Sequence, residues 1–163
     1  MEPVEYRPIQ NEDVEALGTI LGDTWHAYAD GRKRVVCGVI DLANFALRNT
    51  FAEVAVVDNS PIGVIMARAG IPDKQTQDHW ASIKHHACEE LNKLGGCASD
   101  LTRFFDAMEK ADRDLLVHSD CDPDFELVLF AVSSEARGLG VGSTLMEIGR
   151  ASCRERVLWV VGG

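Results

Sequence analysis

A glycine-rich loop near the C-terminal end of the sequence offers the clearest chemistry. It follows the mainly apolar residues 125–132, which are typical of a buried strand, and leads into residues 143–147, which are typical of a helix start. The loop residues are Arg137, Gly138, Leu139, Gly140, Val141, Gly142 and Ser143. Glycines let backbone N–H groups face a ligand, and a helix N-terminus adds unpaired donors and a favourable dipole. This order of elements predicts a phosphate-binding site.

The spacing within the loop resembles the signature of an enzyme superfamily. Arg137, Gly140 and Gly142 match the pattern Arg or Gln, any two residues, Gly, any residue, then Gly or Ala, which is found in the GNAT superfamily of acetyl-CoA-dependent N-acetyltransferases. The resemblance extends over roughly residues 4–147, although only the loop and its strand are specific. It implies an α/β fold with a mixed, mostly antiparallel central sheet flanked by helices. The implied reaction transfers an acetyl group from acetyl-CoA to a primary amine of a small molecule or peptide.

The same resemblance implies contacts for the cosubstrate. Backbone amides from Arg137 through Ser143 would surround the pyrophosphate of acetyl-CoA. Backbone groups of Ala131 and Val132 would pair with the pantetheine arm as though it were an added strand. A non-catalytic acyl-CoA-binding or regulatory module, or an inactive fragment, is the alternative interpretation of these residues.

Glu126 is the candidate catalytic residue. Its strand is similar to the corresponding strand of the histone-acetyltransferase branch, whose glutamate at this position is the general base. An ammonium must lose a proton before its nitrogen attacks a thioester, and the apolar surroundings expected for Glu126 favour proton uptake. Alternatively, Glu126 marks the strand end and faces solvent. Relatives often protonate the departing thiolate with a later tyrosine, but no tyrosine follows Tyr28 in this chain.

The end of the first predicted helix supplies candidates for binding the acceptor amine. His26 and Tyr28 lie where GNAT-like proteins often place acceptor-binding side chains, whereas Trp25 falls on the apolar stripe and is expected in the core. Other chemistry has less support. The loop lacks the third glycine of a dinucleotide-binding fingerprint and the lysine of a Walker loop. His85 and Cys88 share a helix face but have no second ligand pair, so no metal site is expected.

The predicted elements position this loop late in a single domain. We expect a strand at 4–9, a helix from the N-cap Asn11 to 28, a second helix at 35–48, and a hairpin of strands 52–57 and 62–69 around a turn at 58–61. Helices at 75–94 and from the cap Ser99, with its apolar side at residues 101–115, form a helical insertion over about 74–118. The turn with Asp120, Asp122 and Asp124 then leads into the strand before the loop, and the domain ends at residue 147.

The last residues look foreign to the protein. Residues 148–157 match one reading frame of a widely used short-read sequencing adapter, so 148–163 are interpreted as a non-native tail. The strand and helices that would complete the fold are then missing. The loop's strand should therefore lie at an exposed sheet edge, which favours a homodimer formed through that edge.

The bulk composition excludes several classes of function. The 163 residues carry a net charge of −10 and a pI near 4.9, which argues against nucleic acid as the main partner. The five cysteines lack CxxC spacing, which favours reduced thiols. The N-terminus is too polar for a signal peptide, and no apolar run reaches the length of a membrane span. A cytoplasmic protein without membrane attachment is expected.

Overall fold

The described part of the chain folds into four strands, five α-helices and two short 3₁₀ helices. The computed structural model describes residues 3–118 and 125–161, with side chains as far as Ser152. The strands are β1 (Glu5–Pro8), β2 (Phe51–Val57), β3 (Ser60–Arg68) and β4 (Glu126–Val132). The helices are η1 (Asn11–Asp13), α1 (Val14–Trp25), α2 (Gly31–Ala46), α3 (Lys74–Lys93), α4 (Ala98–His118), η2 (Ser134–Ala136) and α5 (Val141–Val161).

The strands form one sheet in the order β1-β2-β3-β4, and every pairing in it is antiparallel. The α/β class is therefore confirmed, whereas no parallel pair of a mixed sheet occurs among the described strands. The β2–β3 turn contains only Asp58 and Asn59, both with positive φ (51° and 60°), so β3 begins earlier than the predicted residue 62. Asp and Asn tolerate this left-handed region, which permits a two-residue hairpin turn.

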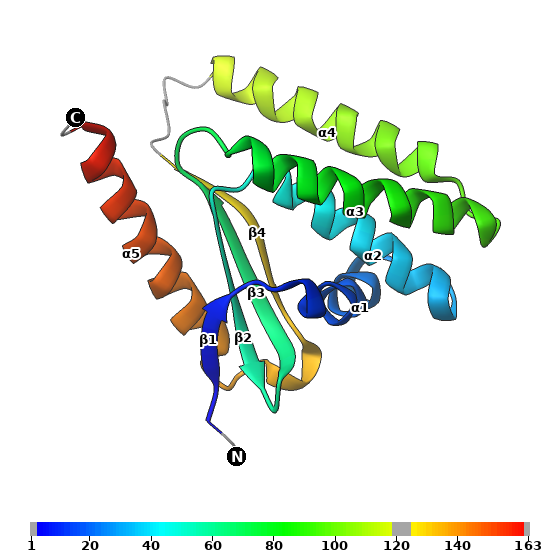
Figure 1. Cartoon of the computed structure of the whole chain (residues 1–163), viewed down its shortest axis with the longest axis horizontal. Coiled ribbons are helices and arrows are strands. Elements are labelled where there is room, and N and C mark those ends of the chain that lie inside the picture. Colours follow the sequence, from blue (N-terminus) through cyan, green and yellow to red (C-terminus); the bar gives the residue numbers. More distant parts are fainter. Residues whose placement is uncertain (1–2, 119–124, 162–163) are drawn as a thin grey trace.

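Helices cover both faces of the sheet. Figure 1 shows α5 crossing one face, while α1 and α2 lie on the other side. Leu17, Leu42 and Val64 belong to the core between α1, α2 and the sheet, and Leu145 of α5 packs with Ile65 on the opposite face. The α1–α2 crossing is close, because a Cβ on Gly38 would lie 2.6 Å from the Gly22 amide nitrogen and nearer still to the Gly18 carbonyl oxygen.

The first helix begins differently from the prediction. The 3₁₀ turn η1 precedes α1, and Gln10, not Asn11, is the N-cap residue of that turn, while Asp13 is the N-cap residue of α1. Asp13 sits at the end of this turn, where its Oδ2 accepts the Gln10 amide at 2.8 Å and both of its oxygens accept hydrogen bonds from Arg7. Because this carboxylate accepts hydrogen bonds both from Arg7 of β1 and from the Gln10 amide, it fixes where α1 starts.

The predicted helical insertion is an antiparallel pair of helices. Figure 1 shows α3 and α4 side by side, with α3 nearer to α2. Helix α4 begins at Ala98, whose amide donates to Asn92 Oδ1, so the predicted cap Ser99 lies inside the helix. Leu115 is exposed although it falls on the predicted apolar side, because nothing described covers the second half of α4. The predicted turn with Asp120, Asp122 and Asp124 lies outside the described residues.

Candidate functional site

A cleft of about 620 Å³ opens beside the glycine loop, at the point where β4 ends. It lies between the last turn of α1, the end of β4, η2 and the start of α5. Its lining residues are Thr24, Trp25, Phe130, Ala131, Val132, Ala136, Arg137, Gly138, Gly140, Gly142 and Ser143. The structure therefore brings together all of the predicted cosubstrate residues except Leu139, whose side chain is exposed, and Val141, whose side chain is buried in the core.

The backbone of the loop has the conformation that its glycines predict. Gly138 and Gly140 have φ values of +79° and +81°, and no atom would meet a Cβ at either position. The first backbone bond of α5 runs from the Thr144 amide to the Gly140 carbonyl (3.1 Å). The amides at positions 141–143 precede that bond and have no acceptor of their own in the helix. The cleft therefore adjoins a helix N-terminus with free donors, which suits an anion.

Arg137 is the positive side chain of this cleft. It is exposed, and no hydrogen bond or ion pair engages its guanidinium among residues 3–118 and 125–152. Most other arginines of this part of the chain, such as Arg7, Arg32 and Arg48, are paired with carboxylates. An unpaired guanidinium beside a helix N-terminus is well placed for a phosphate.

β4 is an edge strand, but its backbone groups do not all face outward. The Ser133 amide donates to the Ile62 carbonyl at 2.9 Å, so backbone groups alternate from that point. Ala131 therefore directs its backbone toward β3, whereas Val132 and Phe130 direct theirs to the open edge. An added strand would therefore form backbone hydrogen bonds with Val132 and Phe130. Of the two residues predicted to bond the pantetheine arm, Val132 can do so, whereas Ala131 offers only its small side chain. A bulge at Val128 interrupts the β3 pairing further along.

Trp25 is a cleft residue that the sequence did not reveal. It is 44% exposed, so the predicted core position is wrong. Its ring packs against Phe45 of α2, with centroids 6.0 Å apart, and it faces the cleft together with Thr24 and Phe130. The sequence feature that indicates exposure is the position of Trp25 in the last turn of α1, directly before a loop, because apolar side chains at helix ends often lie at the edge of the core.

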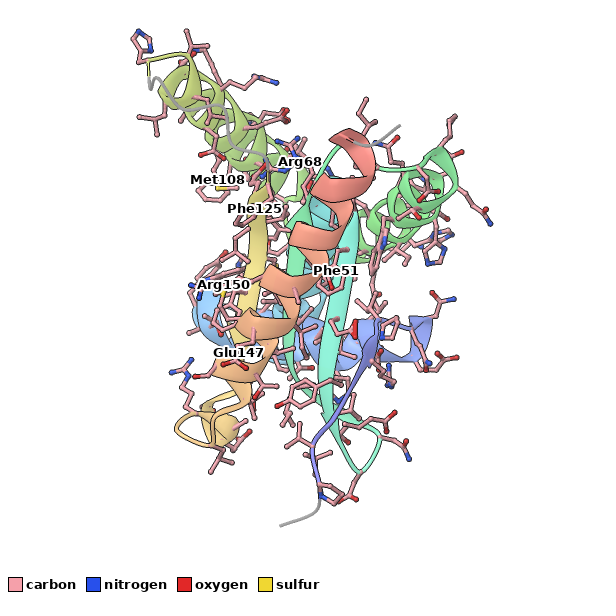
Figure 2. The ribbon with its side chains drawn as sticks, turned by 90° about the vertical axis from the view of Figure 1, so that its left-hand side faces the viewer. Phe51, Arg68, Met108, Phe125, Glu147 and Arg150 are labelled. Atoms are coloured by element: carbon pink, nitrogen blue, oxygen red, sulfur yellow. The ribbon has the colours of Figure 1, made fainter. Side chains whose placement is uncertain are left out.

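Glu126 lies at the far end of β4 from the loop. It precedes Ala131 by five positions, or about 17 Å of extended strand, and it does not line the cleft. Its Oε1 accepts from Arg48 at 2.6 Å and its Oε2 pairs with Arg68 at 2.7 Å. Figure 2 shows Arg68 near Phe125 at this end of the strand. The surroundings are thus charged rather than apolar, and the base role of Glu126 stays a prediction.

His26 and Tyr28 do not line the glycine-loop cleft either. His26, the first residue after α1, is buried and hydrogen-bonded to Asp41 of α2, while the Tyr28 ring lies at the surface. The buried Asp41 was missed, because an acidic residue in an amphipathic helix is typically solvated. Their role as acceptor-binding residues is untested by this placement.

The described residues also bear on metal ligands, free thiols and membrane-spanning helices. Within residues 3–118 and 125–152, no group of three or more His, Cys, Asp or Glu side chains is arranged to hold a metal ion. Cys37, Cys88 and Cys97 are free thiols, whereas Cys121 and Cys153 lie outside the described side chains. None of the helices in the described part of the chain is long and apolar enough to cross a bilayer.

Comparison with known proteins adds no relative. No model of a protein family matches the chain, and no curated protein matches its sequence. The function must therefore be argued from the cleft and the residues around it.

Proposed function

We propose that the chain is a GNAT-like N-acetyltransferase domain that binds acetyl-CoA in the glycine-loop cleft and transfers the acetyl group to a primary amine. The observation that carries the proposal is the position of this cleft. It lies at the open edge of β4, against a helix N-terminus, with the unpaired Arg137 on its rim. A ligand with an anionic part and an extended, amide-containing arm fits such an edge.

The residues present suit that ligand in two respects. The amides at positions 141–143 and the Arg137 guanidinium offer donors to a pyrophosphate. The outward backbone groups of Val132 and Phe130 offer hydrogen bonds to the two amides of a pantetheine arm. Trp25 and Phe130 add apolar walls beside it. The acceptor is a primary amine of a small molecule or peptide, as the resemblance implies, and a cytoplasmic location and a GNAT topology belong to the same proposal.

A non-catalytic acyl-CoA-binding module is the second interpretation of the same cleft. The position of Glu126, distant from the cleft and paired with two arginines, favours it over an enzyme that depends on this carboxylate. Binding and turnover must therefore be measured separately. An enzyme releases free thiol from acetyl-CoA in the presence of an amine, whereas a binding module does not.

Calorimetry tests the binding step. The chain should bind acetyl-CoA and CoA with similar affinity, and it should bind pantetheine, which lacks the phosphates, far more weakly. Arg137→Glu places a carboxylate beside the pyrophosphate and should weaken CoA binding at least 10-fold, which is about 1.4 kcal/mol. Arg113→Glu on α4 is the matched control and should leave affinity unchanged.

The outcomes separate the interpretations. Equal binding of pantetheine and CoA, or unchanged affinity in Arg137→Glu, would contradict the pyrophosphate assignment. CoA binding without thiol release over a panel of primary amines would favour the binding module.

We further propose that two copies pair through the β4 edge. Leu127 is 45% exposed on this strand, and Phe130 and Phe125 are also exposed. Unpaired strand edges with apolar side chains associate readily. Such pairing would compete with an extended ligand at the same edge, so acetyl-CoA should shift the chain toward the monomer.

A further inference from the structure

A row of three polar side chains connects the buried side of α2 with the surface. Asp41 Oδ2 lies 2.6 Å from His26 Nε2, and the Tyr28 hydroxyl oxygen lies 2.9 Å from Nδ1 of the same ring. Asp41 is 3% exposed and His26 is 6% exposed, whereas Tyr28 is 77% exposed. A buried carboxylate and a buried imidazole thus lead to a hydroxyl that solvent can reach.

The directions of the two hydrogen bonds depend on the protonation of His26. In the neutral tautomer that carries its proton on Nε2, this group donates to the Asp41 carboxylate, and Nδ1 accepts from the Tyr28 hydroxyl. Partial burial of the hydroxyl, together with the nearby Asp41 carboxylate, raises the pKa of Tyr28, so its hydroxyl keeps its proton at neutral pH. This is the arrangement of a hydroxyl, a base and an orienting acid that proton-transfer sites require.

We propose that Tyr28, His26 and Asp41 form the general base of the reaction, a proposal that rests on the acetyl transfer proposed above. Tyr28 accepts a proton from the substrate ammonium while its own proton passes to His26 Nδ1. Asp41 stabilises the resulting imidazolium, which later returns this proton to solvent. The neutral nitrogen then forms the N–C bond, the C–S bond breaks, and the second proton lost by nitrogen ends on the CoA sulfur. Tyr28 is unchanged at the end of the cycle.

The position of the row supports this role. Cys37, Asp41 and Phe45 recur every four residues, so they share one face of α2. Phe45 contacts Trp25, which lines the glycine-loop cleft and directly precedes His26. The row is therefore linked to the cleft through the Trp25–Phe45 contact, while His26 and Tyr28 themselves lie outside the cleft lining. By contrast, both oxygens of Glu126 are already engaged by arginines, since Oε1 accepts a hydrogen bond from Arg48 and Oε2 forms an ion pair with Arg68.

Few other titratable groups face His26. On α2 these are Asp41, Cys37 and, further out, Lys33, whose charge acts on Cys37. On α3, Cys88 packs against the same buried cluster. Burial raises the pKa of both thiols, so they stay neutral in the physiological range. Burial also raises the pKa of Asp41, an effect that the hydrogen bond from His26 opposes.

Conservative variants of the full chain test the relay. Tyr28→Phe removes one hydroxyl from a ring at the surface, so the melting temperature should fall only slightly and acetyl-CoA affinity should be unchanged, while kcat/KM for thiol release falls roughly 100-fold. The control is Tyr6→Phe, since the chain has only two tyrosines, and its rate should equal that of the wild type. His26→Gln, which removes the proton acceptor of the relay, should lower kcat/KM to a similar extent. The ¹⁵N NMR spectrum should show His26 protonated at Nε2 and unprotonated at Nδ1 at neutral pH.

The results distinguish the relay from the proposed function. A wild-type chain that fails to bind acetyl-CoA overturns the proposed function. Normal binding with an unchanged rate in Tyr28→Phe, the opposite His26 tautomer, or binding without thiol release for any primary amine overturns the relay. A lowered melting temperature with a wild-type kcat/KM in His26→Gln also overturns it, because that result describes a purely structural role.

Discussion

Arg48, just beyond the end of α2, donates to Glu126 at the start of β4 over a distance of 2.6 Å, although 78 positions separate the two residues. Arg68 of β3 forms an ion pair with the other oxygen of the same carboxylate. The carboxylate therefore joins a helix and two strands where the chain returns to the sheet after α3 and α4. This position makes Glu126 a structural residue whatever its part in catalysis.

Glu126→Gln should lower the free energy of unfolding by about 1–2 kcal/mol, because two half-buried guanidinium groups lose their counter-charge. Urea unfolding at neutral pH measures this change. Glu109→Gln is the matched control, since Glu109 pairs with Arg113 on the exposed surface of α4 and its loss should cost no more than about 0.5 kcal/mol. Equal effects in the two variants would contradict the structural role.

The pair of Arg7 and Asp13 should make stability depend on acid pH. Burial raises the pKa of Asp13, but hydrogen bonds from Arg7 and the Gln10 amide outweigh it, so the net pKa is below the usual value. A lowered folded-state pKa means that this stabilisation is present above the unfolded pKa of 3.8 and is lost as pH falls through the folded value. Asp13→Asn should cost about 3 kcal/mol at pH 7 and should weaken the loss of stability below pH 4. Urea unfolding across this range measures both effects, and an unchanged pH dependence would refute the assignment.

The α1–α2 crossing should not tolerate an added methyl group. Gly38→Ala places Cβ against the backbone of α1, which cannot move locally, so the free energy of unfolding should fall by about 3 kcal/mol or more. Gly149→Ala is the control within another helix, because its Cβ would meet only the flexible end of Ile65 at 2.6 Å. Thermal unfolding should rank Gly38→Ala far below Gly149→Ala, and similar melting temperatures would show that the helices can separate.

Leu127→Lys should shift the chain toward the monomer. A lysine on an edge strand opposes strand pairing between copies because it adds charge where the partner must approach. Sedimentation velocity over a concentration series measures the change. Ile71→Lys, at an exposed loop position outside the sheet, should leave association unchanged. A wild-type chain that remains monomeric at all concentrations would remove the basis for the proposed dimer.

The sequence predicted the elements better than their contacts. Hydrophobic periodicity and turn residues located the four described strands and helices α1 to α4, whereas only the first turns of α5 (Val141–Val161) were predicted as helix. The glycine spacing located the cleft. Trp25 was assigned to the core because periodicity identifies an apolar face without showing where neighbouring elements stop covering it. Glu126 was expected in apolar surroundings because Arg48 and Arg68, which pair with it, are distant in sequence. Asp41 was overlooked for the same reason, since its only hydrogen-bond partner found in the structure lies on another element.

The exposed indole of Trp25 gives the cleft an intrinsic optical reporter. The chain has three tryptophans, and Trp80 is buried between α3 and the core. A molecule that enters the cleft displaces water from the Trp25 ring and should shift its fluorescence emission to shorter wavelength, while the emission of Trp80 stays constant. A Trp25→Phe variant would remove the signal, so that ligands of the cleft can be screened without knowledge of the acceptor.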